Sequence, residues 1–461
     1  MEAPLKTLKN LKFFVLLIAC LTSFLTPFMG SSINIALPAI GKEFHADAIT
    51  QSWVATAYIL SAAVFLVPFG RMADILGRKR IFTTGIFIFT LSSIFSGMAW
   101  SIEILILSRV IQAIGSAMIF GTGLAIITSV FPPEQRGRAM GVNIAAVYIG
   151  LAVGPSAGGF LTSYWGWRSI FFAVIPLGLL IIIILITKLK IEWADSKGEK
   201  FDWLGSFIYA ITLVLLMYGF SSLPKWSGFV MIVTGLITLY LFMRIELKTT
   251  TPIMNIRIFK KNKTFTFSNI AALINYSATF AVGFLLSLYL QYIKGLNARD
   301  AGLVLVAQPI VMALFSPLMG RLSDKIEPRI VASIGMTITS VGLFMLIYLK
   351  STTTIAYLTV VLIILGLGFA FFSSPNTNAI MSSVEKKFLG VASGTVGTMR
   401  LLGQMFSLGI ATLIFAVFIG REEINPANFE MFIRSVNVAF LVFAILCFAG
   451  IFASLARGKI R

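Results

Sequence analysis

Fourteen long apolar segments, separated by short polar stretches, dominate the pattern of hydrophobic and polar positions along this chain. A helix needs roughly 20 apolar residues to cross the hydrocarbon core of a bilayer, and each segment is close to that length or longer. The short connections leave little room for a soluble domain. The sequence therefore predicts an all-α integral membrane protein with transmembrane helices near 12–38, 51–71, 81–99, 103–130, 139–162, 168–187, 204–221, 226–245, 265–292, 300–320, 330–349, 354–381, 389–419 and 431–456.

Two motifs recur at a nearly constant separation, which indicates an internal repeat. The pattern Gly-Arg-x-x-Asp occurs at Gly70–Asp74 and again 250 residues later at Gly320–Asp324. The pattern Gly-x-Ala-x-Gly occurs at Gly137–Gly141 and again 253 residues later at Gly390–Gly394. Duplicated membrane bundles of this kind are typical of secondary transporters. The predicted units are an N-terminal six-helix bundle at 1–190, a linker with two extra transmembrane helices at 191–264, and a C-terminal six-helix bundle at 265–461.

Composition and charge agree with a membrane protein and exclude a soluble one. Hydrophobic residues make up 58% of the 461 residues, charged residues make up 12%, and the mean hydropathy is +0.93. If both termini are cytoplasmic, 27 of the 37 Lys and Arg residues lie in inner segments and 7 lie in outer loops. This bias predicts a multi-pass protein of the plasma membrane with both termini in the cytoplasm. It also accounts for the net charge of +19 through membrane topology and lipid contact, without a nucleic-acid partner.

The loop between the segments at 51–71 and 81–99 contains candidate gating residues. Its glycines, Gly70 and Gly77, permit a tight turn and a close approach of neighbouring helices. Asp74 can accept charge-assisted hydrogen bonds from Arg78 or from a helix N-terminus, so the contact can latch one conformation. Alternatively, the basic residues only set the topology. The repeated motif lacks the Gly-Arg-Lys ending, so we expect it to be a weaker gate. The gating candidates of the two loops are Gly70, Asp74, Gly77, Arg78, Lys79 and Asp324.

Two of the arginines within predicted helices have a glutamine about one helical turn away. Arg109 precedes Gln112, and Arg400 precedes Gln404. An arginine at the middle of a membrane helix costs about 2.5–3.5 kcal/mol on insertion scales, so both should face a wet or polar interior and have partners. The alternative for each is a fixed structural hydrogen bond to backbone carbonyls. We expect these four residues to serve in coupling or in a substrate cavity.

The segment at 139–162 carries a small face made by Gly150, Gly154 and Gly158, and it also contains Pro155. Small faces allow membrane helices to pack closely, and proline removes one backbone hydrogen bond and allows a kink. We therefore expect this helix to provide a bending contact between the two halves. Asn34 and Tyr58 are further candidates for a substrate cavity, although both could instead form hydrogen bonds between helices.

The motifs together resemble those of the major facilitator superfamily, in particular its fourteen-helix branch of drug:proton antiporters. The matching stretches are Gly70–Lys79, Leu107–Gly115, Gly150–Gly159 and Asn34–Pro38, and the resemblance extends over essentially the whole chain. It implies secondary active export of amphipathic small molecules such as drugs, by alternating access and proton antiport. It also implies a role for Arg109 in coupling or substrate handling. The implied partners are a small-molecule substrate, protons and membrane lipid, with the chain acting as a monomer.

One departure from the family pattern concerns acidic residues. Many relatives carry an Asp in the first helix, where this chain has Met29, and none of the 18 Asp and Glu residues falls near the middle of a predicted helix. A mid-membrane carboxylate is the usual means of binding a lipophilic cation and exchanging it for a proton. If protons are coupled, Glu103 or Asp74 is a candidate to carry them, or the charge of the substrate interacts with Arg109 directly. A neutral or anionic substrate would suit the two arginines better.

Other functional classes remain as alternatives. One keeps the fold but moves a neutral or anionic metabolite or a lipid-like solute with little proton coupling. Another is a membrane sensor that transports nothing. The sequence has no Walker-type Gly-Lys-Ser/Thr motif, so ATP is not expected to drive transport. No metal cluster and no set of a nucleophile with its base is apparent, so we expect no enzyme activity and no cofactor.

Overall fold

The computed structural model describes residues 2–194, 196–254, 256–323, 325–385, 389–420 and 422–458. Within these ranges the chain forms helices joined by turns and irregular loops, without strands. Fourteen helical spans are long and apolar enough to cross a membrane, and they coincide with the fourteen predicted segments. The prediction of an all-α membrane protein is therefore confirmed.

Six helices form the first half of the molecule. They are α1 (Glu2–Glu43), α2 (Ala48–Leu76), α3 (Arg78–Gly97), α4 (Ile102–Val130), α5 (Pro133–Trp165) and α6 (Arg168–Lys188). Polar side chains fix where some of them begin: Asp47 accepts a hydrogen bond from the backbone of Thr50, and Ser101 accepts one from the backbone of Ile104. Within this half α1 packs on α5, and α4 packs on both α2 and α3.

Two inserted helices and a short one follow: α7 (Trp203–Ser222), α8 (Trp226–Lys248) and α9 (Ile256–Lys261). The helix α7 packs on α2 of the first half and on α8. Glycines allow the close approach of α7 and α8, because a Cβ at Gly219 would lie 3.0 Å from the backbone nitrogen of Ile232. Most of α8 is exposed on the outside of the bundle, as expected for a helix that faces lipid.

The remaining elements form the second half. They are α10 (Lys263–Thr279), α11 (Ala281–Leu288), η1 (Tyr289–Ile293), α12 (Ala298–Leu305), α13 (Ala307–Ser323), α14 (Pro328–Leu346), α15 (Ile355–Ser382), α16 (Leu389–Phe418) and α17 (Phe429–Ala456). Here α14 packs on α15 and α17, and α10 packs on α16 and α17.

Two membrane spans of the second half are interrupted where the sequence predicted single helices. The span predicted at 265–292 is divided between α10 and α11, because the backbone N–H of Ala281 donates to Ser407 Oγ of α16 at 2.9 Å. The span predicted at 300–320 is divided between α12 and α13. Pro309 lacks the N–H that would donate to the carbonyl of Leu305, and Leu305 is the last residue of α12.

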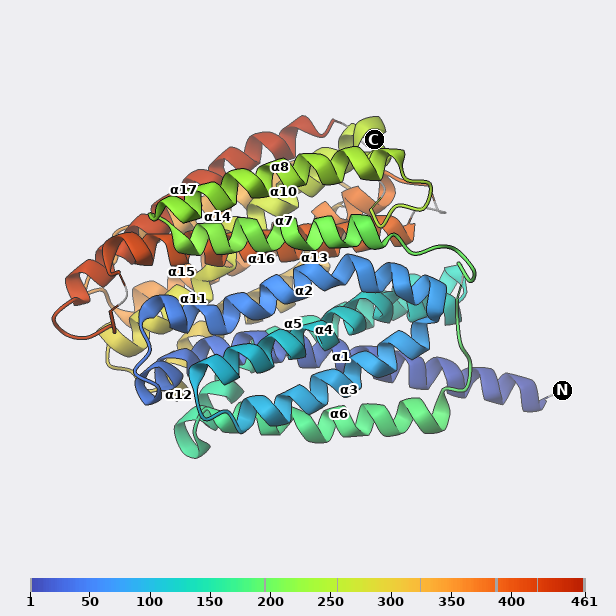
Figure 1. The fold of residues 1–461 in the computed structure, drawn as a ribbon, viewed down its shortest axis with the longest axis horizontal. Helices are drawn as coiled ribbons and strands as arrows, with labels where there is room; N and C mark the ends of the chain where they lie inside the picture. The colour runs from blue at the N-terminus through green and yellow to red at the C-terminus, as the bar shows by residue number, and fades with distance from the viewer. Residues whose placement is uncertain are drawn as a thin grey trace.

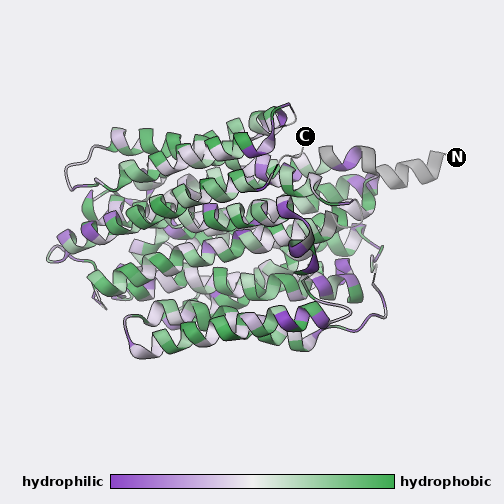
Figure 2. Ribbon diagram, turned by 90° about the horizontal axis from the view of Figure 1, so that it is seen from above, coloured by the Kyte–Doolittle hydropathy of each residue, from purple (hydrophilic) through white to green (hydrophobic). Residues whose placement is uncertain are grey.

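The two halves lie side by side with their helices along a common direction (Figure 1). The chain termini, the α2–α3 loop and the α6–α7 linker lie at one end, which we call the terminal end. The α1–α2, η1–α12 and α16–α17 loops lie at the opposite end, which we call the far end. Hydrophilic residues gather toward the two ends, and the middle of the bundle is mainly hydrophobic (Figure 2). The hydrophobic middle is the part that fits a bilayer.

Candidate functional site

An ion pair ties three helices of the first half together at the terminal end. The guanidinium of Arg78 donates to Asp74 Oδ1 from Nε at 2.9 Å and from Nη2 at 2.7 Å. Its Nη1 donates to Ser129 Oγ of α4 at 2.7 Å. The Arg78 side chain is 12% exposed and that of Asp74 is 34% exposed, so the pair is partly shielded from water. The contact that the sequence suggested between Asp74 and Arg78 is therefore present.

The glycines of this loop serve the two purposes that the sequence indicated. Gly77 has a φ of 117°, which L side chains rarely adopt, and it forms the turn between α2 and α3. Gly70 faces Gly121 of α4, where an added Cβ on Gly121 would lie 3.2 Å from the Gly70 Cα. One glycine therefore makes the turn, and the other allows α2 and α4 to approach.

The α6–α7 linker binds to this loop, which the sequence analysis missed. The carboxylate of Glu192 accepts hydrogen bonds from the backbone N–H of Lys79 at 2.8 Å and of Arg80 at 3.1 Å. These are unsatisfied donors at the start of α3, where a negative charge is favourable. A Cβ at Gly77 would meet the Glu192 carboxyl carbon at 2.5 Å, so glycine is also needed for this approach.

Further contacts of the linker reinforce the attachment. Arg71 Nη2 forms an ion pair with Glu199 at 2.5 Å, and its Nη1 donates to Ser196 Oγ at 3.2 Å. The backbone N–H of Ser196 donates to the carbonyl of Asp74 at 2.9 Å. The backbone N–H of Arg78 donates to the carbonyl of Trp193 at 2.8 Å. We call the four residues Glu192, Trp193, Ser196 and Glu199 the linker strap. They resemble any polar loop in sequence, so only the fold shows where they bind.

Arg109 lies inside the first half and is only 1% exposed. Its guanidinium lies over the ring of Tyr58 at 4.1 Å and donates to Gln112 Oε1 and, at 3.4 Å, to the carbonyl of Val54. Gln112 in turn donates to Ser93 Oγ at 2.7 Å, and Tyr58 donates to Ser116 Oγ at 2.8 Å. Three of the expected cavity residues thus form one buried network that joins α2, α3 and α4.

Arg400 has a different environment. It is half-buried on α16 and lies over the ring of Tyr276 of α10, 5.7 Å from the ring centre. Within the described parts of the chain it forms no hydrogen bond and no ion pair. Tyr148 of α5, in the other half, lies close enough to Tyr276 to interact with it electrostatically. Gln404 is buried one turn away, with 6% of its surface exposed. Arg400 is therefore a charged group near the boundary between the halves that has no charged partner among the described residues.

The glycines of α5 pack this helix onto α1 of the same half. Added Cβ atoms at Gly150, Gly154 and Gly158 would lie 2.5–2.6 Å from atoms of α1 between residues 24 and 32. The hydroxyl of Ser32 donates to the carbonyl of Gly154 at 2.9 Å across this interface. The expected contact of this helix with the other half is therefore not made by these three glycines, which the close packing of α1 and α5 requires.

Two neighbouring residues of α5 do face the second half. A Cβ at Gly302 of α12 would overlap the carbonyl oxygen of Pro155, and a Cβ at Gly159 would lie 3.1 Å from the Cα of Arg299. The backbones of α5 and α12 therefore come into close contact at the far end.

All described hydrogen bonds between the two halves lie at this far end. The carbonyl of Asn34, an expected cavity residue, accepts from Ser287 Oγ at 2.6 Å. Additional pairs are Gln291 with the Ile35 carbonyl, Gln51 with Tyr292, Ser52 with Thr412, the Ala48 N–H with the Glu422 carbonyl, and Arg299 with Ser163 and Tyr164. The structure is thus closed at the far end.

Near the repeated loop of the second half lies a buried arginine that the sequence analysis did not single out. Asp324, the predicted gating residue there, lies outside the described residues. Nearby, Arg457 is fully buried and donates to Asn376 Oδ1 at 2.9 Å and to Ser268 Oγ at 3.3 Å. Burial lowers the pKa of Arg457 to about 10, so it stays charged at neutral pH. It joins α10, α15 and α17, although its sequence position resembles an ordinary basic tail.

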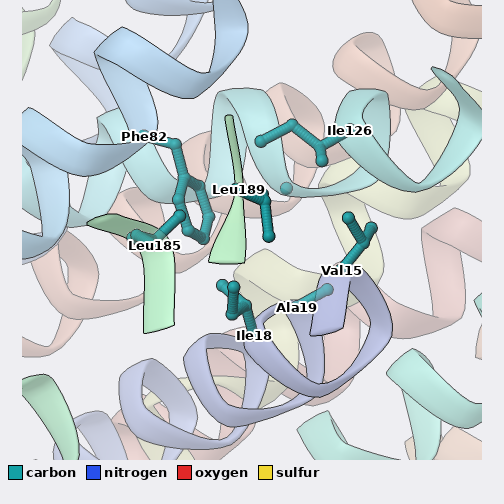
Figure 3. A pocket seen from close by; sticks show the side chains of 8 residues that line it. Val15, Ile18, Ala19, Phe82, Ile126, Leu185 and Leu189 are labelled. Atoms are coloured by element: carbon teal, nitrogen blue, oxygen red, sulfur yellow. The ribbon is translucent and has the colours of Figure 1, made fainter. Parts of the chain in front are cut away.

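Neither of two voids in the described structure lies between the halves. The first, about 10 Å³ in volume, is enclosed by apolar side chains of α1, α3, α4 and α6, including Val15, Phe82 and Leu185 (Figure 3). It has room for about one water molecule at most, and its apolar lining favours a dry void. The second is a groove of about 460 Å³ among α14, α15 and α17. No group of three or more His, Cys, Asp or Glu side chains among the described residues could hold a metal ion.

The comparison with known proteins agrees with this architecture. The chain is 32% identical over 442 residues to the riboflavin transporter RibZ of Clostridioides difficile (strain 630), covering 95% of this chain and 96% of that protein. It is 29% identical over 393 residues to the multidrug resistance protein Stp of Mycobacterium tuberculosis (strain CDC 1551 / Oshkosh), covering 84% and 73% of the two chains.

Solved structures share the fold at low sequence identity. A bacterial homolog of the human lysosomal transporter Spinster, in an inward-facing and unoccupied conformation, matches with a TM-score of 0.66 and 19% identity over 97% of each chain. The sequence profile described as Major Facilitator Superfamily matches residues 19–265 and 268–459. Transporters of this superfamily bind their substrates between two helical bundles. The chain belongs to the Major Facilitator Superfamily.

Proposed function

We propose that this protein is a secondary active transporter that moves an amphipathic aromatic solute, uncharged or anionic, by alternating access between its two halves. The observation that carries the proposal is Arg400, a half-buried mid-membrane cation without a charged partner in the described chain. Leaving such a charge unpaired in a membrane is costly, which favours a role in function. An anionic or hydrogen-bonding solute would supply the missing acceptor.

Aromatic side chains beside Arg400 suit a planar solute. Tyr276 lies under the guanidinium, and its ring also contacts Phe369 of α15 with 5.7 Å between the ring centres. Tyr148 of the first half interacts electrostatically with Tyr276. Aromatic rings stack on planar ligands, and a guanidinium can lie over them or donate to their polar edges. A solute bound here would contact α5, α10 and α16, and so both halves.

The far-end contacts support the alternating-access part of the proposal. Described hydrogen bonds join the halves at the far end, whereas the linker strap binds the terminal end of the first half alone. With cytoplasmic termini, as the positive-inside bias favours, the state described here is closed to the outside. Export then requires these far-end contacts to separate. Movement of protons down their gradient, implied by the motif at Gly150–Gly159, would supply the energy.

The relatives suggest which solutes to test first. Riboflavin, named for the RibZ relative, is a planar aromatic molecule without net charge and fits the proposed class. A lipophilic cation is the second candidate, because another relative is named a multidrug resistance protein. It would need a nearby negative charge, and no Asp or Glu lies near the middle of a described span. We therefore place riboflavin-like solutes before cationic drugs.

The proposal is tested by measuring efflux of riboflavin and of ethidium from transporter-deficient cells that express the chain, with and without a protonophore. We expect riboflavin efflux that the protonophore reduces and that Arg400→Ala removes. Ethidium efflux should stay at the background level. Ethidium efflux without riboflavin efflux, at matched membrane expression, would overturn the proposed substrate class in favour of cation export.

A further inference from the structure

Two carboxyl groups face each other at the terminal ends of α7 and α8, away from the proposed solute site. Asp202 caps the start of α7, where its Oδ1 accepts the N–H of Gly205 at 2.8 Å. Glu246 lies near the end of α8, is 1% exposed, and its Oε2 accepts the N–H of Met254 at 3.0 Å. Each carboxyl group therefore has one oxygen that is satisfied by a backbone donor.

The remaining two oxygens have no donor. Asp202 Oδ2 and Glu246 Oε1 are both buried and lack a hydrogen-bond partner among the described residues. A Cβ added to Gly205 would overlap both atoms, which places them close together over this glycine. Glycine is therefore needed at 205 to admit the two oxygens.

Neighbouring cations do not neutralise the pair. On α8, Arg244 lies over the ring of Tyr240, 5.9 Å from its centre. On α9, Arg257 donates to the carbonyl of Leu247 at 2.9 Å. Lys200 lies two residues before Asp202, Lys248 lies two residues after Glu246, and Lys260 lies on α9. None of these five basic residues forms an ion pair with either carboxylate in the described structure.

Two ionised carboxylates in this position would repel each other and leave two buried acceptors unpaired. A single proton removes both penalties, because the protonated group then donates to the other. Asp202 is the better anion, since it lies at a helix N-terminus and accepts a backbone N–H there. The proton therefore belongs on Glu246 Oε1, which then donates to Asp202 Oδ2.

We propose that Asp202 and Glu246 form a proton-binding site that holds one proton between them at the terminal end of the inserted helix pair. Release of this proton separates the carboxylates, and it loosens the contact of α7 with α8 and with the segment that leads into α9. The site thus makes the inserted pair sensitive to pH on the side where the termini lie. The inference does not depend on the proposed substrate, because its readout is stability and not transport.

The experiment compares thermal unfolding of the purified full-length protein at pH 6 and pH 8.5 for the wild type and Glu246→Gln. The glutamine keeps the size of the side chain and supplies a permanent N–H donor to Asp202. The melting temperature of the wild type should fall between pH 6 and pH 8.5. In Glu246→Gln we expect this fall to be smaller, by on the order of 2 °C. Glu430→Gln, whose side chain is 82% exposed, is the matched control and should melt like the wild type at both pH values.

A second measurement keeps the inference testable if the variant folds poorly. Infrared spectra of the wild type at pH 7 should contain a protonated-carboxyl C=O band that is absent in Glu246→Gln and retained in Glu430→Gln. Equal pH dependence of unfolding in wild type and Glu246→Gln, or an unchanged carboxyl band, would overturn the proposal. Stabilisation of the wild type at pH 8.5 by added Na⁺ or Ca²⁺, lost in Glu246→Gln, would also overturn it and assign a metal cation to the site.

Discussion

Arg109 and Arg400 both lie within membrane-spanning helices and have a nearby glutamine, yet the fold gives them opposite environments. Arg109 is enclosed by one half, where Gln112, the Val54 carbonyl and the Tyr58 ring satisfy it. Arg400 is half-buried, lies over the Tyr276 ring, and forms no hydrogen bond or ion pair in the described chain. The difference suggests that a charge within one half stabilises that half, whereas a charge between the halves is available to a solute.

Replacing the enclosed arginine should have the largest effect. Arg109→Ala leaves Gln112 Oε1 and the Val54 carbonyl without their donor and opens a void under Tyr58, so we expect a loss of about 3 kcal/mol in the free energy of unfolding. Thermal unfolding of the purified protein measures it. Arg434→Ala is the control, because this side chain is 69% exposed and its removal should change stability by less than about 0.5 kcal/mol. A fully stable Arg109→Ala that loses only transport would remove the distinction between the two arginines.

Replacing the arginine between the halves should affect transport and leave folding nearly intact. Arg400→Ala removes no hydrogen bond of the described protein, so its unfolding should change by less than about 1 kcal/mol. Transport of an uncharged or anionic solute should fall by about 10-fold or more, as expected for loss of a hydrogen bond to a charged group. Arg400→Lys should keep part of the activity. Vesicle transport at matched protein content tests this, and normal transport by Arg400→Ala would contradict it.

A substitution at Gly302 tests the contact between the two halves without changing a charged residue. In Gly302→Ala the new methyl group would overlap the Pro155 carbonyl, so the far end should open more often. We would measure disulfide formation between Ser163→Cys and Arg299→Cys in a background without Cys20 and Cys447, and expect a several-fold reduction.

Gly141→Ala is the matched control for this experiment, because an added Cβ there has no atom within 4 Å. The control should leave disulfide formation unchanged. Equal yields in Gly302→Ala and in the parent would show that the close approach of α5 and α12 does not limit closure.

A small effect on stability is expected at the terminal end. Asp74→Asn weakens a partly exposed ion pair with Arg78, which should lower the free energy of unfolding by about 0.5–1 kcal/mol. Transport should nevertheless fall, because we expect this contact to hold one conformation of the cycle. Expression and transport are measured together in the same vesicles. Near-normal expression with normal transport would leave Asp74 without a gating role.

The sequence predicted the elements of this fold well and the partners of its polar residues less well. Apolar segments of membrane length can be read directly, and the positive φ of Gly77 follows from its place in a turn. The environment of Arg109 could not be predicted from the sequence, because an apolar helix face has the same sequence pattern whether it packs inside one half or between the two halves. Gly150, Gly154 and Gly158 of α5 were assigned to the wrong interface for that reason, whereas Gly159 does lie against the second half.

Other residues were missed because their sequence carries no distinguishing pattern. The strap residue Glu192 lies in an ordinary polar linker, and Arg457 follows the last helix like any basic tail residue. Their functions in holding helix ends arise from contacts between segments far apart in the chain. Asp202 and Glu246 likewise lie 44 positions apart in sequence and meet only because α7 and α8 are antiparallel neighbours.

The most direct test of the central claim is equilibrium binding of riboflavin to the purified protein, followed by quenching of flavin fluorescence. The account predicts saturable binding by the wild type, at least about 10-fold weaker binding by Arg400→Ala, and partial recovery in Arg400→Lys. Arg434→Ala should bind like the wild type. Equal affinity of the wild type and Arg400→Ala would contradict the account, because Arg400 would then not contact the solute.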